Sequence, residues 1–326
     1  MTGFTLAHFS DPHLGPLPAA GWQELASKRI TGFLSWKRNR VKIHQPRILD
    51  LLLQDLKAQQ YDHLAITGDL INISLPDEFK AAAAWLQRVG KPADVTIIPG
   101  NHDAYVEVPW AQSLGLWADY MHGSRTVGAQ DTQPASFEDF PFVRRLGDVA
   151  LIGTSTALPM PPFIAAGRLG EAQLSRLRTL LTDLGRQGLF RIVLIHHPPF
   201  GGGAYKRKAL LDASAFQQVL AEAGAELVLH GHTHVSGLAY IKRPQGPIPV
   251  IGVPSASAAP AGHKDESRYH LYRINRTEGG WRLGIDVRGL NLAQDAFTAQ
   301  GSMELAIPLI VSDTNMAPGV TTGAAA

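Results

Sequence analysis

Five short polar segments, each placed directly after an apolar run, constrain this chain more than any other feature of its sequence. The preceding runs are rich in β-branched and aliphatic residues, which is typical of buried strands. In an open α/β sheet, ligands bind outside the carboxyl ends of the strands, so segments that are distant in sequence can converge on one site. The five segments are residues 9–13 (FSDPH), 67–69 (TGD), 99–103 (PGNHD), 195–199 (IHHPP) and 230–234 (HGHTH).

The composition limits which residues can serve as ligands. The 326 residues include no cysteine, which excludes disulfides and thiolate ligands and leaves His, Asp, Glu and Asn. The formal net charge is only +2, so bulk charge gives no indication of a nucleic-acid partner, and we expect no specific nucleic-acid binding. With 45% hydrophobic and 18% charged residues, the chain has the composition of an ordinary globular protein.

Apolar runs alternate with helix-like segments, which predicts an α/β fold in which helices flank a sheet. From residue 248 onward the pattern changes to consecutive strands, and this predicts a β-rich second half of a sandwich. We expect one domain over residues 1–312 and a disordered tail over residues 313–326, which are mostly Gly, Ala, Thr and Pro. Amphipathic helical spacing predicts helices at residues 47–59, 77–89, 171–184 and 213–223.

The polar segments supply the donors of a two-metal site. Two divalent ions about 3.5–4 Å apart need His and carboxylate ligands and one carboxylate that contacts both ions. A hydroxide bound between the ions would be the nucleophile, because a metal lowers the pKa of its water to about 7. Gly68, Gly100 and Gly231 would let the backbone turn close to the ions. The predicted ligands are Asp11, His13 and His234 for one ion, Asn101, His196 and His232 for the other, and Asp69 as the bridge.

These motifs, in this order, resemble the pattern D-x-H, G-D, G-N-H-[DE], H and G-H-x-H of the calcineurin-like metallophosphoesterases. The match runs from Asp11 to His234. The segments IHHPP and HGHTH resemble the branch that contains class III cyclic-nucleotide and glycerophosphodiester phosphodiesterases. The resemblance implies a four-layer αββα sandwich of the metallophosphoesterase type. It also implies the ligand set given above, with His196 rather than His197 as the ligand that ends its strand.

The same resemblance implies roles for two further residues. His102 would not be a ligand but would contact the phosphate and help to protonate the leaving oxygen, and Asp103 would orient it. The implied function is a binuclear metal-dependent phosphoesterase that holds two divalent ions, for which Mn, Fe, Zn, Co and Ni suit these donors about equally.

The implied substrate is a phosphoester, and resemblance favours a phosphodiester over a monoester. One alternative is a diphosphatase that acts on a lipid-linked sugar nucleotide such as UDP-diacylglucosamine, as some relatives do. An alternative of another class is a non-catalytic scaffold that keeps the fold and binds partners. The retention of every expected ligand argues against the scaffold, because an abandoned site has no physical reason to keep seven costly polar ligands together.

A basic segment interrupts the motif pattern near the N-terminus, at about residues 20–45. Residues 25–49 contain no acid but seven Lys and Arg residues interleaved with apolar and aromatic ones. One interpretation of residues 25–43 is a helical flap that contacts anionic membrane or admits a lipid-linked substrate. The other is an inserted helical hairpin that packs its aromatic residues on the body and exposes its charges to solvent.

A second basic cluster, Lys206, Arg207 and Lys208, follows a run of three glycines close to the IHHPP segment. Lys206, Arg207 and His197 are therefore candidates for contact with a substrate phosphate, because Arg offers a bidentate fork to its oxygens. The alternative is a solvated loop that leads into the next helix.

Two expectations rest on residues outside these motifs. Met1 leads almost directly into a strand, without the features of a signal peptide, and no apolar run approaches 18 residues. We therefore expect a cytoplasmic protein without a spanning helix, peripheral to the inner face of the membrane if the basic segment contacts lipid. The histidines outside the pattern are expected to be structural or surface residues: His8, His44, His63, His122, His263 and His270.

Overall fold

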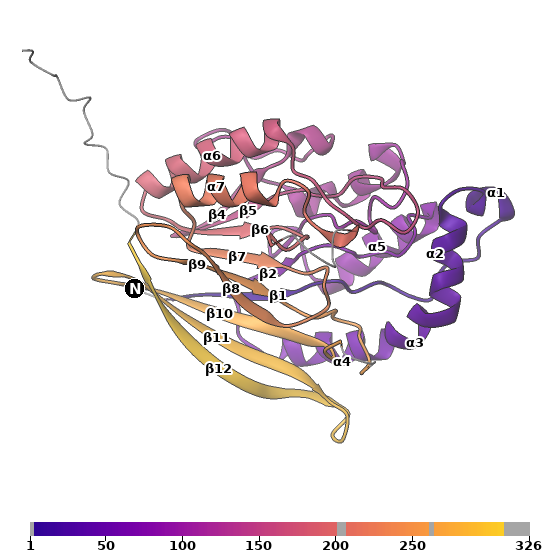
Figure 1. Cartoon of the computed structure of the whole chain (residues 1–326). Helices are drawn as coiled ribbons and strands as arrows, with labels where there is room; N and C mark the ends of the chain where they lie inside the picture. The colour runs from indigo at the N-terminus through magenta and orange to yellow at the C-terminus, as the bar shows by residue number, and fades with distance from the viewer. Residues whose placement is uncertain (1–2, 201–206, 261–263, 310–326) are drawn as a thin grey trace, which may run out of the picture.

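Two six-stranded sheets lie face to face at the centre of the protein, and helices cover their outer faces (Figure 1). The computed structural model describes residues 3–200, 207–260 and 264–309. In spatial order, the strands of the first sheet are β12 (Ala296–Pro308), β11 (Gly280–Asn291), β10 (Arg268–Thr277), β1 (Phe4–Phe9), β2 (His63–Ile66) and β3 (Val95–Ile97). Those of the second are β4 (Phe142–Leu146), β5 (Val149–Gly153), β6 (Phe190–Leu194), β7 (Leu227–His230), β9 (Ile248–Gly252) and β8 (Gly237–Ile241).

Helices complete the outer layers. α4 (Pro46–Lys57) and α5 (Pro76–Val89) pack on the first sheet, whereas α6 (Glu171–Arg186) and α7 (Ala213–Ala223) pack on the second (Figure 1). The predicted four-layer αββα sandwich is therefore confirmed. The four predicted helices are present, and the predicted run of strands after residue 248 is also confirmed. The predicted tail, residues 313–326, lies outside the described residues, and the extent of the domain stays a prediction.

Strand β6 shows how the sequence pattern builds these layers. Successive side chains of a strand point to opposite faces of the sheet. Phe190, Ile192 and Leu194 belong to the core between the two sheets. Val193, together with Ile195 just after the strand, belongs to the core beneath α6 and α7. Because both faces of β6 are buried, its sequence is apolar except for Arg191, whose buried guanidinium pairs with the Glu226 carboxylate.

Local signals set the start of the helices on the first sheet. α4 and α5 both begin with a proline, whose fixed φ and missing N–H suit the first helical position. The Glu78 carboxylate accepts hydrogen bonds from the backbone N–H groups of Asn72, Ile73 and Leu75. This carboxylate therefore fixes the turn that follows the second polar segment and connects it to α5.

Parallel pairing brings the motif-bearing strands to one edge of each sheet. β1 pairs with β2 and β2 with β3 in parallel, and β6 pairs with β7 in parallel. The five polar segments all leave the carboxyl ends of these strands, which is the edge where an α/β sheet binds ligands.

The basic segment forms a helical arm beside this edge. A short helix, α1 (Trp22–Leu25), precedes α2 (Arg29–Ser35), and a π-helical turn (Trp36–Arg40) and α3 (Val41–Ile43) follow α2 without a break (Figure 1). The segment is therefore a nearly continuous helical run from residue 29 to residue 43 rather than a hairpin of two helices. Within the described part of the chain, no helix is long and apolar enough to cross a membrane.

Candidate metal centre

The backbone is strained where the predicted ligands occur. Among the described residues, eight non-glycine residues have positive φ, and five of them are predicted ligands. Such conformations cost about 1–3 kcal/mol each and cluster at functional sites, where the surrounding structure enforces them. The five are Asp11 (φ 53°), His13 (φ 42°), Asp69 (φ 56°), His232 (φ 68°) and His234 (φ 56°).

Backbone contacts between the polar segments enforce this strain. The N–H groups of Asp11 and His13 donate to the carbonyls of Gly68 and Asp69, each at 3.0 Å. Gly68 has a φ of +95°, and a Cβ there would lie 2.6 Å from the Gly100 nitrogen. A side chain at this position would push the second and third segments apart.

The first group of donors contains Asp11, His13 and His234. The His234 Nε2 lies 3.1 Å from Asp11 Oδ1 and 3.3 Å from the His13 Nε2. The His13 Nε2 lies 3.8 Å from Asp11 Oδ1. All three side chains are buried, so the group is held together by the protein rather than by chance contact at the surface.

The second group contains Asn101, His196 and His232, and Asp69 stands between the groups. The His196 Nε2 lies 3.2 Å from Asn101 Oδ1 and 3.4 Å from Asp69 Oδ2. Asp69, His196 and His232 each place a ligand atom within 4.8 Å of the others. Asp69 Oδ2 is also 3.8 Å from the His13 Nε2 of the first group. The structure thus brings all seven predicted ligands into two groups that meet at Asp69.

These separations fit divalent metal ions. Metal–ligand bonds of about 2.0–2.2 Å at octahedral or tetrahedral angles place neighbouring ligand atoms about 2.8–3.6 Å apart. Four of the distances between donor atoms, 3.1, 3.2, 3.3 and 3.4 Å, fall in this range, and the two from the His13 Nε2 to carboxylates are 3.8 Å. Small side-chain shifts would therefore complete either group.

Burial and neighbouring charges favour the protonation states that metals require at most of the predicted ligands. Burial, reinforced by the nearby Arg40 guanidinium, lowers the pKa of His13 well below its ordinary value. Burial also lowers the pKa values of His232 and His234. Burial alone would raise the pKa of Asp69, but the neighbouring His196 and His102 lower it overall. Neutral imidazoles and ionised carboxylates are the forms that bind a metal. His196 is the exception, because burial lowers its pKa but the Asp69 and Asp11 carboxylates raise it overall to about 9, so its ring must lose a proton when an ion binds.

The histidine that resemblance assigns to the leaving group lies beside Asp69 but is not oriented by its neighbouring acid. The His102 Nδ1 lies 2.5 Å from the Asn72 carbonyl oxygen, and the ring stacks on Tyr105. The Asp103 carboxylate instead accepts hydrogen bonds from the backbone N–H groups of Asp69, Ile71 and Gly100. Asp103 therefore braces the loops that carry the ligands, and its influence on His102 is indirect.

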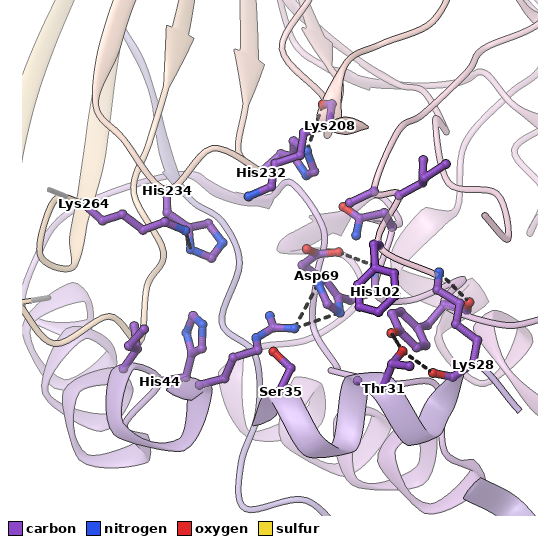
Figure 2. A pocket seen from close by; sticks show the side chains of 18 residues that line it. Lys28, Thr31, Ser35, His44, Asp69, His102, Lys208, His232, His234 and Lys264 are labelled. Carbon is purple, nitrogen blue, oxygen red and sulfur yellow. Dashed lines mark hydrogen bonds between the residues drawn. The ribbon is translucent and has the colours of Figure 1, made fainter. Parts of the chain in front are cut away.

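A pocket of about 370 Å³ opens over these residues (Figure 2). It is lined by Asp69, Asn101, His102, His232 and His234 of the predicted site. Four basic residues also line it: Lys28, Arg40, Lys208 and Lys264. A pocket with four basic side chains and one carboxylate favours an anionic ligand.

Arg40 is a site residue that the sequence reasoning missed. Its guanidinium nitrogens lie 3.0–3.1 Å from the ring nitrogens of His13 and His102. The sequence pattern gave Arg40 no distinction from the other bases of its segment.

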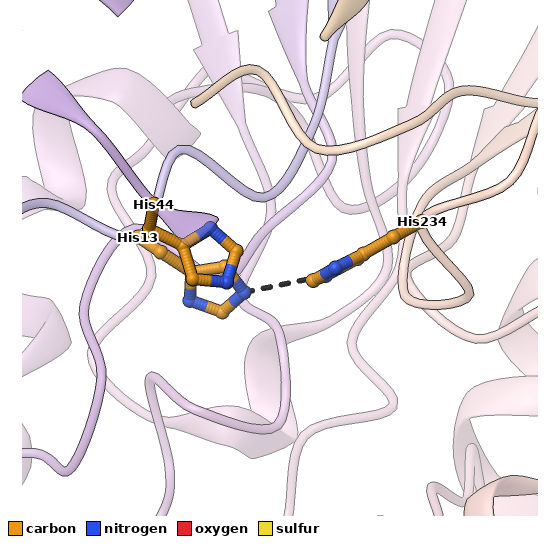
Figure 3. Close-up of side chains that lie close together, drawn as sticks. All are labelled: His13, His44 and His234. Atoms are coloured by element: carbon orange, nitrogen blue, oxygen red, sulfur yellow. Dashed lines mark hydrogen bonds between the residues drawn. The ribbon is translucent and has the colours of Figure 1, made fainter. Parts of the chain in front are cut away.

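His44, which was expected to be a structural or surface residue, also lies at the candidate site, where it lines the pocket. It is buried beside His13 and His234, and one ring nitrogen of each of the three lies within 4.8 Å of the others (Figure 3). The available signal was its place four residues after Arg40, which puts both side chains on one helical face.

Two of the three predicted phosphate contacts, His197 and Arg207, do not line the pocket. His197 is buried, and its ring nitrogens contact the Thr156 hydroxyl and the Ala165 carbonyl. It packs against His232, with the ring centroids 4.2 Å apart, and does not line the pocket. Arg207 is exposed and also does not line the pocket. Lys206 lies outside the described residues. Of the two cluster residues that the structure describes, Arg207 and Lys208, it is Lys208 that lines the pocket.

Comparison with known proteins identifies the class of this fold and site. A sequence model of the family described as calcineurin-like phosphoesterase matches residues 4–236. The chain therefore belongs to the calcineurin-like phosphoesterase family, and the resemblance found in the motifs is confirmed. Members of this family are metal-dependent phosphoric ester hydrolases with a dimetal centre. A search of curated proteins gives no match.

Solved structures show the same fold at low sequence identity. A dimetal phosphatase from Danio rerio is 14% identical with a TM-score of 0.59, and the match covers 94% of this chain and 99% of that protein. A purple acid phosphatase from seeds of yellow lupin (Lupinus luteus) is 13% identical, also with a TM-score of 0.59. That match covers 99% of this chain and 57% of the lupin protein.

Proposed function

We propose that this protein is a binuclear metal-dependent phosphodiesterase. The observation that carries the proposal is the position of Asp69 between two buried donor groups, at the floor of a pocket lined by basic side chains. Two divalent ions, when bound, would polarise the phosphoryl oxygens and lower the pKa of a water molecule so that it can attack phosphorus. The proposed ligands are the seven residues named above.

Arg40 is the side chain best placed to bind the substrate phosphate. A guanidinium can donate two parallel N–H bonds to phosphate oxygens and stays charged at any physiological pH. Arg40 reaches the pocket between His13 and His102, so a phosphate held there would lie beside both donor groups. Lys28, Lys208 and Lys264 add positive charge around it.

His102 is proposed to protonate the leaving oxygen. When its Nδ1–H donates to the Asn72 carbonyl, the ring orientation is fixed and the Nε2 lies at the pocket, 3.0 Å from the Arg40 Nη1. To protonate the departing alcohol from Nε2, the ring must be the imidazolium, with one proton donated to the Asn72 carbonyl and the other on Nε2. Burial and the Arg40 guanidinium lower the pKa of His102 to about 3, so the negative charge of a bound phosphate would be needed to favour this form. Stacking on Tyr105 keeps the ring in this orientation.

Preference for a diester rests on the resemblance of the IHHPP and HGHTH segments to the phosphodiesterase branch.

Asp69→Asn tests the metal-dependent chemistry, because it removes the charge of the carboxylate that lies between the two donor groups. We expect it to lower both metal content and turnover of bis-nitrophenyl phosphate. Chelated wild-type protein should recover activity with Mn²⁺ or a similar ion. Full turnover by metal-free protein would refute the proposal, and a metal-binding protein inactive on every phosphoester would favour the scaffold.

Substrate choice is tested with a panel on the wild-type protein. The panel contains bis-nitrophenyl phosphate, a nitrophenyl monoester, cyclic nucleotides and UDP-diacylglucosamine. We expect the highest kcat/KM on a diester. A higher value on the monoester would contradict the diester assignment while leaving the metal chemistry intact.

The second candidate, a diphosphatase for a lipid-linked sugar nucleotide, is favoured by the outer face of the helical arm. Ile30, Leu34 and Val41 are 50%, 50% and 40% exposed at helical spacing, and Lys37 and Arg38 are exposed beside them. An adjacent face of the arm, which includes Thr31, Gly32 and Ser35, lines the pocket (Figure 2). An arm with an apolar, basic outer face could lie on an anionic membrane and pass a lipid-bearing phosphate to the site. In this proposal the protein is cytoplasmic and peripheral to the inner face of the membrane.

Co-sedimentation with anionic vesicles at low and high salt tests this candidate. Leu34→Ser with Val41→Ser should weaken vesicle binding and raise the KM for lipid-bearing substrates, without affecting small diesters. Salt should also weaken binding, because the Debye length is only about 8 Å at physiological ionic strength. Leu292→Ser is the matched control, since Leu292 is 62% exposed between β11 and β12. Wild-type protein that stays in the supernatant at both salt concentrations would rule out the membrane role.

A further inference from the structure

We infer that His44, contributed by the helical arm, is an additional ligand of the ion held by Asp11, His13 and His234. The inference rests on the proposed binuclear centre and goes beyond its seven ligands. It would give this ion a third imidazole and would connect the arm directly to the metal centre.

Geometry carries the first step. The His44 ring centroid lies 4.3 Å from that of His13 and 5.5 Å from that of His234 (Figure 3). One ring nitrogen from each residue lies within 4.8 Å of the other two. The His13 and His234 Nε2 atoms are already 3.3 Å apart, so a small movement of the His44 ring would complete a three-nitrogen set.

Hydrogen bonding selects the nitrogen that would bind. The His44 Nδ1 lies 3.0 Å from the Ser257 hydroxyl and 3.3 Å from the Ser255 hydroxyl. The Nε2 is therefore the nitrogen available to a metal. Metal-bound histidines usually have their other nitrogen hydrogen-bonded, and this partner fixes the tautomer and the ring plane. The Ser255 hydroxyl donates to the Asp11 carbonyl at 2.6 Å, so the same serine links His44 to a proposed ligand loop.

Backbone contacts hold the end of the arm at this position. The Gln45 N–H donates to the Ser257 carbonyl at 2.9 Å, and the Ala259 N–H donates to the Ile43 carbonyl at 2.8 Å. These two bonds flank His44 on either side. A residue fixed in this way loses little conformational entropy when it binds an ion.

A third imidazole would also change which metals are preferred. Imidazole suits Zn²⁺ and Ni²⁺, whereas oxygen donors suit Mn²⁺, and the affinity of a nitrogen-containing site rises from Mn²⁺ through Co²⁺ to Ni²⁺. His44 would therefore strengthen binding of Co²⁺ more than binding of Mn²⁺. This difference separates a ligand from a residue that merely supports the fold.

The test compares His44→Asn and His44→Ala with the wild-type protein. The Asn amide reaches about as far as Nδ1, so His44→Asn can keep the contact with Ser257 while it lacks the Nε2. His122→Asn is the matched control, because His122 lies outside the pocket and outside both donor groups. The measurements are metal ions per chain, dissociation constants for Co²⁺ and Mn²⁺, and the visible spectrum of the Co²⁺-loaded protein.

We expect both His44 variants to bind one of the two Co²⁺ ions about 10- to 100-fold more weakly, with a smaller loss for Mn²⁺ and an altered Co²⁺ spectrum. The second ion and the His122→Asn control should be unchanged. If His44→Asn keeps the Co²⁺ affinity and spectrum of the wild-type protein, the inference is overturned. This holds even if the KM of the variant rises, because His44 would then contact the substrate and not the metal. Wild-type protein that binds fewer than two ions would instead refute the proposed binuclear centre.

Discussion

Gly231 lies where two of the polar segments come closest, and Gly231→Ala should damage the metal centre selectively. A Cβ at this position would lie 2.7 Å from the Ser10 Cβ and would also collide with Ser10 Oγ and Asp11 Oδ2. Ser10 and Asp11 are fully buried, so neither can swing into solvent. The loop after β7 or the loop after β1 must therefore move.

The size of the effect follows from the cost of overpacking. Extra methyl groups in a packed interior typically cost about 1–3 kcal/mol. Asp11 Oδ2 accepts the His232 N–H at 2.9 Å, and Asp11 Oδ1 is 3.1 Å from the His234 Nε2. If displacement of the Asp11 carboxylate relieves the strain in the metal-free protein, metal binding must return the carboxylate to its place and restore the strain. Metal affinity should then fall by roughly 5- to 150-fold.

Metal dissociation constants from calorimetric titration, together with thermal unfolding midpoints with and without metal, measure this effect. Gly237→Ala is the matched control, because a Cβ at Gly237 meets nothing within 4 Å. We expect the control to match the wild-type protein in both measurements. If Gly231→Ala keeps the metal affinity and the unfolding midpoint of the wild-type protein, the metal centre does not require the close approach of these two loops, and the reasoning is refuted.

Three other substitutions separate catalysis, substrate binding and stability. His102→Ala should keep two ions per chain yet lose about 10²–10⁴-fold in rate on alkyl esters and much less on nitrophenyl esters; equal losses would assign it to phosphate binding instead. Arg40→Lys should keep the metals while kcat/KM falls about 10- to 150-fold, because one bidentate charged contact is lost; unchanged kinetics would exclude the contact. Glu226→Ala should cost about 3–5 kcal/mol in denaturant unfolding, because it leaves Arg191 charged and buried; a loss below 1 kcal/mol would contradict this.

The layers and the ligand groups were predictable because they depend on short-range patterns. Apolar runs of strand length followed by Asp, His or Asn predicted both the strands and the edge where the donors meet. Helical spacing predicted α4, α5, α6 and α7 close to their observed bounds. Strands and helices each have a characteristic spacing of apolar residues, so the sequence predicts them without knowledge of the segments that pack against them.

The helical arm shows where the sequence was insufficient. Its basic and apolar residues alternate around the whole helix, so no stripe indicates which face points to the body. The structure buries Trp36, which is 8% exposed, and leaves Ile30 and Leu34 half exposed. It also turns Arg40 into the pocket. Only the docking of the arm against neighbouring loops decides these orientations.

The sequence by itself determined the residue types at the centre, their order and the strands that carry them. The tertiary structure decided which other side chains join them, because His44 and the 255–259 loop are about two hundred residues apart and meet only after both sheets have formed. It also decided that Asp103 braces backbone N–H groups and that His197 packs behind His232. A ring or carboxylate next to a motif has several possible hydrogen-bond partners within reach, and the local sequence does not determine which of them it contacts. The packing of separate loops determines the partner through burial and hydrogen bonding.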